Sequence, residues 1–325
     1  MKTVPDDPDH PLESAADRKR RLYLERKQGP TQVLDPAPQM SDDTLWRGLT
    51  RDGQARLLVV RATQAAREAA ERLESSNDVA KLIGEFLVGA LLIRSTLNPE
   101  ERLQLFVNHE GPVGQLIVDG WDNGGIRAYV KHSHEETATF GFLVGAGVLQ
   151  VSRSRTFNRQ AHQTSVALQG DSVEEFLMHY LLESEQILSL LRIEVIADQG
   201  KIQSALGYIV QLMPEGTRED LAQITANLDA LHKLQIGMNM DDPDGRQWAE
   251  QLLRGFTWDQ CAREQVRYQC RCSEDRILAM LSSLPRADIA DLAAGVEPLE
   301  MTCDYCRTKY NIRPAQVAML LELPS

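Results

Sequence analysis

The sequence Cys270-Arg271-Cys272, followed later in the chain by Cys303-Asp304-Tyr305-Cys306, decides how the C-terminal part of this protein folds. Zn²⁺ prefers tetrahedral coordination by cysteine sulfur, and two short cysteine pairs on separate turns can converge to supply four ligands. Helix-like patterns over 275–284 and 287–294 lie between the pairs and would pack the two turns together. No histidine follows His232, so the pattern predicts one zinc ion held by four thiolates.

Four thiolates fill the tetrahedron around zinc, whereas a catalytic zinc keeps an open position for water and a nearby general base. A zinc hydrolase is therefore disfavoured. The sequence also holds no G-x-S-x-G elbow, phosphate-binding glycine loop or H-E-x-x-H motif, so we expect no enzyme activity. A constitutive zinc-ribbon interaction protein, whose metal only holds a small domain together, stays open as the alternative from spacing alone.

Two features of the cysteine pattern favour a redox-sensitive site. The C-x-C pair places two thiolates so close that oxidation must strain or break the metal site, and the thiolate is the oxidisable form of cysteine. Structural zinc contributes on the order of 10–16 kcal/mol in small domains, comparable with the whole stability of an ordinary domain. Loss of the metal would unfold the module, so oxidation is predicted to act as a folding switch.

The composition of the chain is that of a globular protein. It has 325 residues, 42% apolar and 25% charged, and its net charge of −12 with 6% aromatic content argues against nucleic-acid binding. The most apolar segment, 86–93, is far shorter than the roughly 20 residues that span a bilayer. The acidic, proline-broken N-terminus lacks the pattern of a signal peptide, so we expect a cytoplasmic protein without a membrane partner.

Changes in composition and periodicity predict four regions and an α+β class with a mixed sheet-plus-helix main domain. The regions are a disordered extension (1–42), an α+β main domain (43–213), a helical, metastable linker (214–269) and a zinc-binding redox-switch domain (270–325).

Particular patterns support the α+β main domain. Leu103, Leu105 and Val107 alternate as a strand does, and Ile126, Ala128 and Val130 repeat that alternation after the turn-like residues 122–125. Helices are predicted to begin near Asn77 and at Ser172. The second of these has a capping box with Glu175 and an apolar stripe that continues to Leu191.

The chain resembles the HslO family of redox-regulated heat-shock holdase chaperones, the 33 kDa chaperonins. Residues 266–273 (VRYQCRCS), Leu284-Pro285 and residues 300–310 (EMTCDYCRTKY) carry the resemblance, and weaker similarity runs through most of 43–325. The resemblance implies a bacterial cytosolic chaperone with a substrate-binding domain, a helical linker and a zinc domain, inactive when reduced and zinc-bound.

The same resemblance implies how the protein is activated. Oxidation would form the neighbouring disulfides Cys270–Cys272 and Cys303–Cys306, with release of zinc and unfolding of the linker. Homodimers of the oxidised form would then bind unfolded or oxidatively damaged client proteins without ATP. We expect the client surface in the linker, around Phe256, Trp258 and residues 234–240, rather than in the apolar stripes of the two predicted helices.

Two smaller features, a fifth cysteine and a histidine pair, have structural as well as functional interpretations. Cys261 lies nine residues before Cys270, close enough to act as an accessory thiol in disulfide exchange, but a buried bystander thiol is the favoured interpretation. The pair His132 and His134 precedes two glutamates, but a solvated turn explains it better than a metal site, and no role is expected for it.

Overall fold

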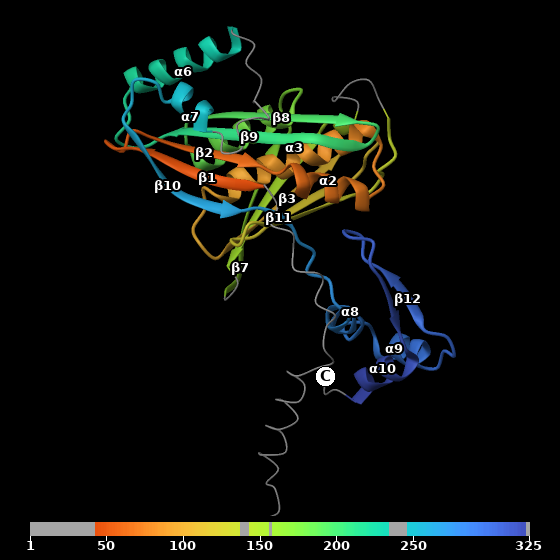
Figure 1. The fold of residues 1–325 in the computed structure, drawn as a ribbon. Helices are drawn as coiled ribbons and strands as arrows, with labels where there is room; N and C mark the ends of the chain where they lie inside the picture. The colour runs from red at the N-terminus through yellow and green to blue at the C-terminus, as the bar shows by residue number, and fades with distance from the viewer. Residues whose placement is uncertain (1–42, 137–142, 156–157, 234–245, 323–325) are drawn as a thin grey trace, which may run out of the picture. The chain divides into compact units, whose positions relative to one another are not determined.

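The computed structural model describes residues 43–136, 143–155, 158–233 and 246–322 (Figure 1). The predicted disordered extension and residues 234–245 of the predicted linker lie outside the described residues. Within these ranges the chain folds into two larger sheets, a two-stranded sheet and several helices, which confirms the α+β class.

The first sheet is antiparallel and has the strand order β10-β1-β2-β9-β8. Its strands are β10 (Trp258–Gln265), β1 (Thr44–Thr50), β2 (Ala55–Arg61), β9 (Lys201–Leu212) and β8 (Ser189–Asp198). The second sheet has the order β11-β5-β4-β3-β6-β7, and only the β11–β5 pair within it is parallel. Its strands are β11 (Arg267–Tyr268), β5 (Gly125–Val130), β4 (Leu116–Gly120), β3 (Glu101–His109), β6 (Gly147–Arg155) and β7 (Asn158–Ala167).

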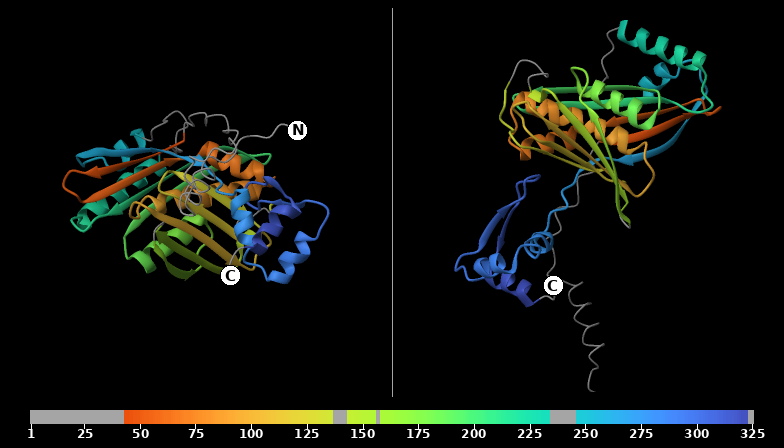
Figure 2. Two further views of the ribbon diagram at one scale, coloured as in Figure 1. Left: turned by 90° about the horizontal axis from the view of Figure 1, so that it is seen from below. Right: turned by 180° about the vertical axis from the view of Figure 1, so that it is seen from behind.

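Helices α2 (Thr63–Arg72) and α3 (Asn77–Arg94) pack between the two sheets, as the view from behind in Figure 2 shows. The apolar run 86–93 lies in α3, where nearly every side chain is buried, because the helix contacts β8 and β9 on one side and β3, β4 and β5 on the other. Ser76 caps this helix by accepting a hydrogen bond from the backbone nitrogen of Val79 at 3.4 Å. Over the described ranges, no helix is long and apolar enough to cross a membrane.

The predicted strands of the main domain are confirmed. The two alternating triads, one in β3 and one in β5, point into the core with no exposed surface, and the turn at 122–125 joins β4 to β5. The alternation identified them because each strand buries one face against α3 and leaves the other mostly half-buried.

The second predicted helix begins as expected but ends early. α5 (Val173–Tyr180) starts at Ser172, whose hydroxyl accepts a hydrogen bond from the backbone nitrogen of Glu175 at 3.2 Å. The predicted continuation of its apolar stripe to Leu191 is wrong, because a short π-helical turn, η1 (Leu181–Glu185), ends at the left-handed Gln186. Leu191 instead lies in β8, since pairing with β9 along the whole strand outweighs the helical pattern.

The helical prediction for the linker holds for part of its length. α6 (Arg218–Lys233) and α7 (Arg246–Leu252) are helices, but residues 258–268 form strands β10 and β11, so the prediction is wrong there. β10 joins the open edge of β1 and leaves most of its residues exposed or half-buried, so it carries no apolar alternation to reveal a strand. We call residues 258–268 the edge segment.

The linker helices cover the outer face of the first sheet. Trp248 and Leu252 of α7 pack with Val59 and Tyr208 of that sheet, and the rings of Tyr208 and Trp248 lie 5.7 Å apart. In the edge segment, Trp258 stacks on Trp46 at 5.9 Å. The region is therefore packed against the main domain in this structure, although its composition looks weakly helical.

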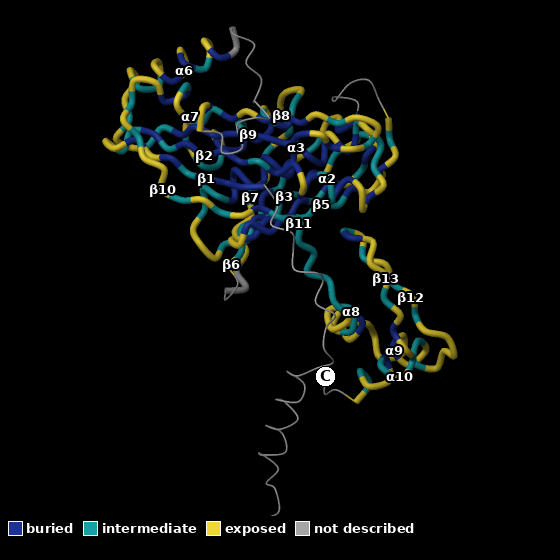
Figure 3. Tube along the Cα trace, in the orientation of Figure 1, coloured by how far each residue is buried: buried dark blue, intermediate teal, exposed yellow. Residues whose placement is uncertain are grey.

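The C-terminal module (residues 270–322) is small. It contains α8 (Glu274–Leu281), α9 (Arg286–Ala293), β12 (Leu299–Thr302), β13 (Lys309–Ile312), α10 (Pro314–Ala318) and η2 (Met319–Glu322), which confirms the two helix-like patterns between the cysteine pairs. The buried apolar cluster of the module has four members, Leu281, Ile289, Ile312 and Val317. Most other residues of the module are exposed or half-buried (Figure 3). So small a core needs an additional crosslink. By their contacts residues 41–325 form one compact unit, and the boundaries at 213 and 269 stay predictions.

Candidate metal centre

The structure brings the four predicted cysteines together. Cys270 and Cys272 follow β11 directly, and Cys303 and Cys306 lie in the turn between β12 and β13. All four Sγ atoms lie within 4.8 Å of one another, and no other cluster of three or more possible metal ligands occurs in the described ranges. The Sγ atoms of Cys270 and Cys303 are 3.7 Å apart, and those of Cys272 and Cys306 are 3.3 Å apart.

These distances fit a tetrahedral metal. Four sulfurs at about 2.3 Å from a central Zn²⁺ are about 3.8 Å from one another. We call these four residues the four-cysteine centre. The described cysteines are free thiols, so the centre has the donor set of a structural zinc site, in which all four positions are filled by protein.

Local backbone geometry explains how each pair presents its sulfurs. In the second pair, the backbone nitrogen of Cys303 donates to the carbonyl of Thr308 and that of Arg307 donates to the carbonyl of Cys303. Arg307 adopts a left-handed φ of 58°, which closes this turn tightly. The first pair is fixed differently, because the backbone nitrogen of Gln269 donates to the carbonyl of Ile126 and so anchors the chain on β5 just before Cys270.

Hydrogen-bond donors surround the sulfurs. The hydroxyl of Tyr310 donates to Sγ of Cys272 at 3.0 Å, and Nη1 of Arg127 donates to Sγ of Cys270 at 3.6 Å. The Sγ atom of Cys306 donates to Oγ1 of Thr308 at 3.2 Å. Donors placed like Tyr310 and Arg127 stabilise thiolates and orient them as ligands.

The cysteines shift one another's pKa values in opposite directions. Burial raises the pKa of Cys272 to about 11, and hydrogen bonding to Cys270 and Cys306 raises the pKa of Cys303. Hydrogen bonds from Cys270 and Cys303 hold the pKa of Cys306 well below its usual value. Four sulfurs this close share protons unless a cation compensates their charge, so the residues present fit a divalent metal.

The sequence of the chain also matches a known protein family. A family model described as Hsp33 protein matches residues 43–313. The chain belongs to the Hsp33 family. This confirms the resemblance drawn from the cysteine motifs, and it gives the protein a chaperone role.

Individual Hsp33 relatives agree with that membership. A 33 kDa chaperonin of Thermus thermophilus is 30% identical over 294 residues, covering 85% of each chain. A 33 kDa chaperonin of Nostoc punctiforme is 28% identical over 293 residues, covering 86% of this chain and 96% of its own. The crystal structure of a 33 kDa chaperonin from Thermotoga maritima superposes with a TM-score of 0.74 at 23% identity, over 87% of this chain and 98% of that one. This last likeness concerns the fold alone.

Residue spacing missed the groups that surround the sulfurs. Arg127 comes from β5, far from the cysteines in sequence, and its role depends on how the chain folds back on itself. Tyr310 lies within the quoted cysteine motif, but spacing gives no sign that its hydroxyl points to a sulfur. The remaining cysteine, Cys261, is exposed on β10 and lies outside the four-cysteine centre. The interpretation of Cys261 as a buried thiol is therefore wrong. Its accessory role in disulfide exchange stays a prediction.

Proposed function

We propose that this Hsp33-family chaperone is a redox-regulated, ATP-independent holdase, inactive while Cys270, Cys272, Cys303 and Cys306 hold one zinc ion as thiolates. One observation carries the proposal: the first cysteine pair is the direct continuation of the edge segment, which adds a strand to each of the two larger sheets. A change at the cysteines therefore acts on the edge segment, whose packing helps to shield the outer face of the first sheet from solvent.

The shielded surface is apolar. The outer face of the first sheet carries Val59, Tyr208 and Val210, which are at most 4% exposed while the linker helices and Trp258 lie over it. Release of the linker would expose this face together with Trp248 and Leu252. An apolar patch of that kind is what unfolding proteins bind.

The chemistry of activation balances as thiol oxidation. Each disulfide forms as two thiols lose two protons and two electrons to an oxidant, so hypochlorous acid yields chloride and water, and hydrogen peroxide yields two waters. Two disulfides leave no thiolate to hold a metal. When bound, zinc supplies a tetrahedral crosslink between the two cysteine pairs, and its stabilisation of the small module is lost with the ligands.

The neighbouring disulfides Cys270–Cys272 and Cys303–Cys306 are proposed from the family resemblance. Two sulfur contacts of this structure join cysteines of different pairs, Cys270 with Cys303 at 3.7 Å and Cys272 with Cys306 at 3.3 Å. All four sulfurs are within reach of one another, so proximity does not select the pairing. Peptide mapping of the oxidised protein distinguishes the two sets.

The remaining family features form part of the same proposal. The oxidised protein would form homodimers and bind unfolded or oxidatively damaged clients in the cytoplasm, without an enzymatic step. The net charge of −12 supports the view that neither nucleic acid nor a membrane is its partner. The division into main domain, linker and zinc-binding switch domain is proposed with the boundaries given above.

One experiment tests the proposal against its rival. The reduced protein is assayed for bound zinc and then treated with hypochlorous acid or warm peroxide, while zinc release and the aggregation of a heat-denatured client are followed together. We expect client protection only after oxidation. Equal protection before and after treatment, or none in either state, would sink the switch, and zinc that survives oxidation would favour the constitutive zinc-ribbon protein.

A further inference from the structure

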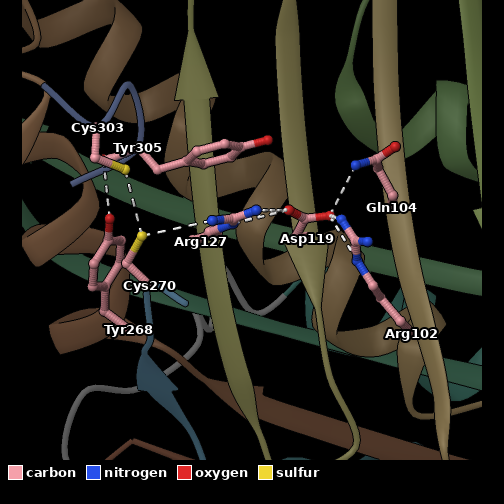
Figure 4. Close-up of polar contacts among 8 residues, drawn as sticks. All are labelled: Arg102, Gln104, Asp119, Arg127, Tyr268, Cys270, Cys303 and Tyr305. Carbon is pink, nitrogen blue, oxygen red and sulfur yellow. Dashed lines mark hydrogen bonds and ion pairs between the residues drawn. The ribbon is translucent and has the colours of Figure 1, made fainter. Parts of the chain in front are cut away.

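A buried carboxylate in the second sheet holds the arginine nearest the cysteines. The Asp119 side chain on β4 has no exposed surface. Its Oδ1 accepts hydrogen bonds from Nε of Arg102 at 3.1 Å and Nε2 of Gln104 at 3.0 Å, and its Oδ2 accepts from Nε and Nη2 of Arg127 at 2.9 and 2.7 Å (Figure 4). The two-point contact fixes the plane of the Arg127 guanidinium.

The guanidinium of Arg127 contacts both cysteine pairs from this fixed position. Its Nη1 donates to Sγ of Cys270 in the first pair, and its carbon Cζ lies 3.6 Å from the centroid of the Tyr305 ring inside the second pair (Figure 4). The arginine side chain is only 13% exposed. A cation on an aromatic face gains more when it is shielded from water in this way.

The charges of the two groups complement each other. Arg102 and Arg127 share the single charge of Asp119, so this cluster keeps one net positive charge beside the four-cysteine centre. Four thiolates around one Zn²⁺ carry two net negative charges. Two disulfides carry none, so oxidation removes the negative partner while the positive cluster stays in the sheet.

A second set of contacts to the centre goes to backbone carbonyls rather than to a sulfur. Nη1 of Arg72, at the end of α2, donates to the backbone carbonyl of Cys306 at 3.2 Å, and the Tyr268 hydroxyl donates to the carbonyl of Tyr305 at 3.0 Å. Carbonyl acceptors keep their character when the thiols are oxidised. Arg127 instead donates directly to a ligand sulfur, so its contact changes when that sulfur is oxidised.

We propose that Arg127, oriented by Asp119, is the positioning residue that docks the four-cysteine centre on β5, and that this docking depends on the thiolate charge. Oxidation then weakens the attachment of the C-terminal module to the second sheet directly, in addition to removing the metal crosslink. The inference rests on the proposed zinc site but not on chaperone activity.

The test uses reduced full-length protein without oxidant or client. Zinc extraction by excess of a chromogenic chelator and amide exchange of residues 267–272 are measured for Arg127→Lys, Tyr305→Leu and Tyr305→Phe. Lysine keeps the charge but loses the planar two-point contact, leucine removes the aromatic face, and phenylalanine restores it. Arg155→Gln, on β6 with a side chain 58% exposed, is the control.

We expect extraction and exchange to become about tenfold faster in Arg127→Lys and Tyr305→Leu, since a lost contact of roughly 1.4 kcal/mol is a tenfold change. Tyr305→Phe and Arg155→Gln should behave as the unaltered protein does. Wild-type rates in both Arg127→Lys and Tyr305→Leu would overturn the proposal. Tyr305 lies outside the main core, so Tyr305→Leu tests the docking proposal even if Arg127→Lys folds poorly. Neither outcome depends on client protection, so failure here is separable from failure of the holdase proposal.

Discussion

The Sγ atoms of Cys272 and Cys306 lie 3.3 Å apart although the two residues are 34 positions apart in the sequence. Because each contributes one of four ligands, Cys272→Ser should lower bound zinc from one ion per chain to well below one after dialysis against a weak chelator. Elemental analysis of the reduced protein measures this. Cys261→Ser, outside the four-cysteine centre, is the matched control and should keep its zinc, and full zinc in Cys272→Ser would contradict the ligand assignment.

The Tyr310 hydroxyl donates to the Cys272 sulfur at 3.0 Å, so its removal tests the surroundings of the ligands. Tyr310→Phe should weaken zinc binding about tenfold, because groups that orient metal ligands typically contribute factors of 10 to 100 in affinity. Competition with a chelator of known affinity gives the number. Tyr129→Phe, on β5 with its ring against Tyr305, serves as the comparison. Unchanged affinity in Tyr310→Phe would show that this hydrogen bond does not stabilise the site.

Gly124 in the turn between β4 and β5 allows the edge segment to approach. Its φ is 73°, and an added Cβ would lie 1.9 Å from the carbonyl oxygen of Gln265. Gly53 has the same φ of 73°, but the nearest atoms to its Cβ position, in Glu215, are 3.8 Å away. Gly53→Ala should therefore cost only the left-handed strain of roughly 1–2 kcal/mol, whereas Gly124→Ala must also displace the edge segment.

We expect reduced Gly124→Ala to show faster amide exchange over residues 258–268 and measurable client protection before any oxidant is added. Gly53→Ala, with the same backbone strain, should show neither. Identical behaviour of the two variants would mean that the close approach at Gly124 does not hold the edge segment in place.

The half-buried Glu85 on α3 makes stability depend on pH. Burial raises the pKa of Glu85 from 4.5 to about 7, with Lys81 opposing and Glu174 reinforcing the shift. The unfolded chain then loses this proton at lower pH than the folded chain, so the free energy of unfolding falls as pH rises from about 4.5 to 7. The shift corresponds to roughly 3 kcal/mol.

Glu85→Gln should therefore reduce the loss of stability between pH 5 and pH 8 and be the more stable protein at pH 8. Urea unfolding of the zinc-loaded protein, followed by tryptophan fluorescence, measures the difference. Asp43 has its pKa raised to about 6, again mainly by burial, so some dependence of the same sign should persist. A parallel pH profile in Glu85→Gln would show that this carboxyl does not titrate between the folded and unfolded states.

Much of the centre was predictable from sequence because its ligands are encoded by residue type and short spacing. Cys270, Cys272, Cys303 and Cys306 needed no tertiary information to be chosen, and the alternation in β3 and β5 reflects burial on one face. Strand β10 was not predicted because both of its faces are largely open to solvent, which leaves no periodic pattern of apolar residues. The stripe near Leu191 misled because strand pairing with β9 outweighed a helical pattern.

The contacts of Arg127 with Asp119 and Cys270 could not be predicted from the sequence for another reason. Asp119 meets Arg127, and Arg127 meets Cys270, only after β4, β5 and β11 have assembled, and no short spacing links these residues. The role of a buried charged residue in a sheet can be assigned only when its partners are known.

Amide hydrogen exchange in the edge segment tests the central claim, that the state of the cysteines decides whether this segment stays on the two sheets. The backbone nitrogens of Val266, Arg267 and Gln269 donate to carbonyls of Asp43, Gly124 and Ile126. The account predicts that these amides are protected in the reduced, zinc-loaded protein, exchange rapidly after oxidation and regain protection after reduction with zinc, while β3 and β4 stay protected throughout. Equal protection of the three amides in the reduced and oxidised protein would contradict it.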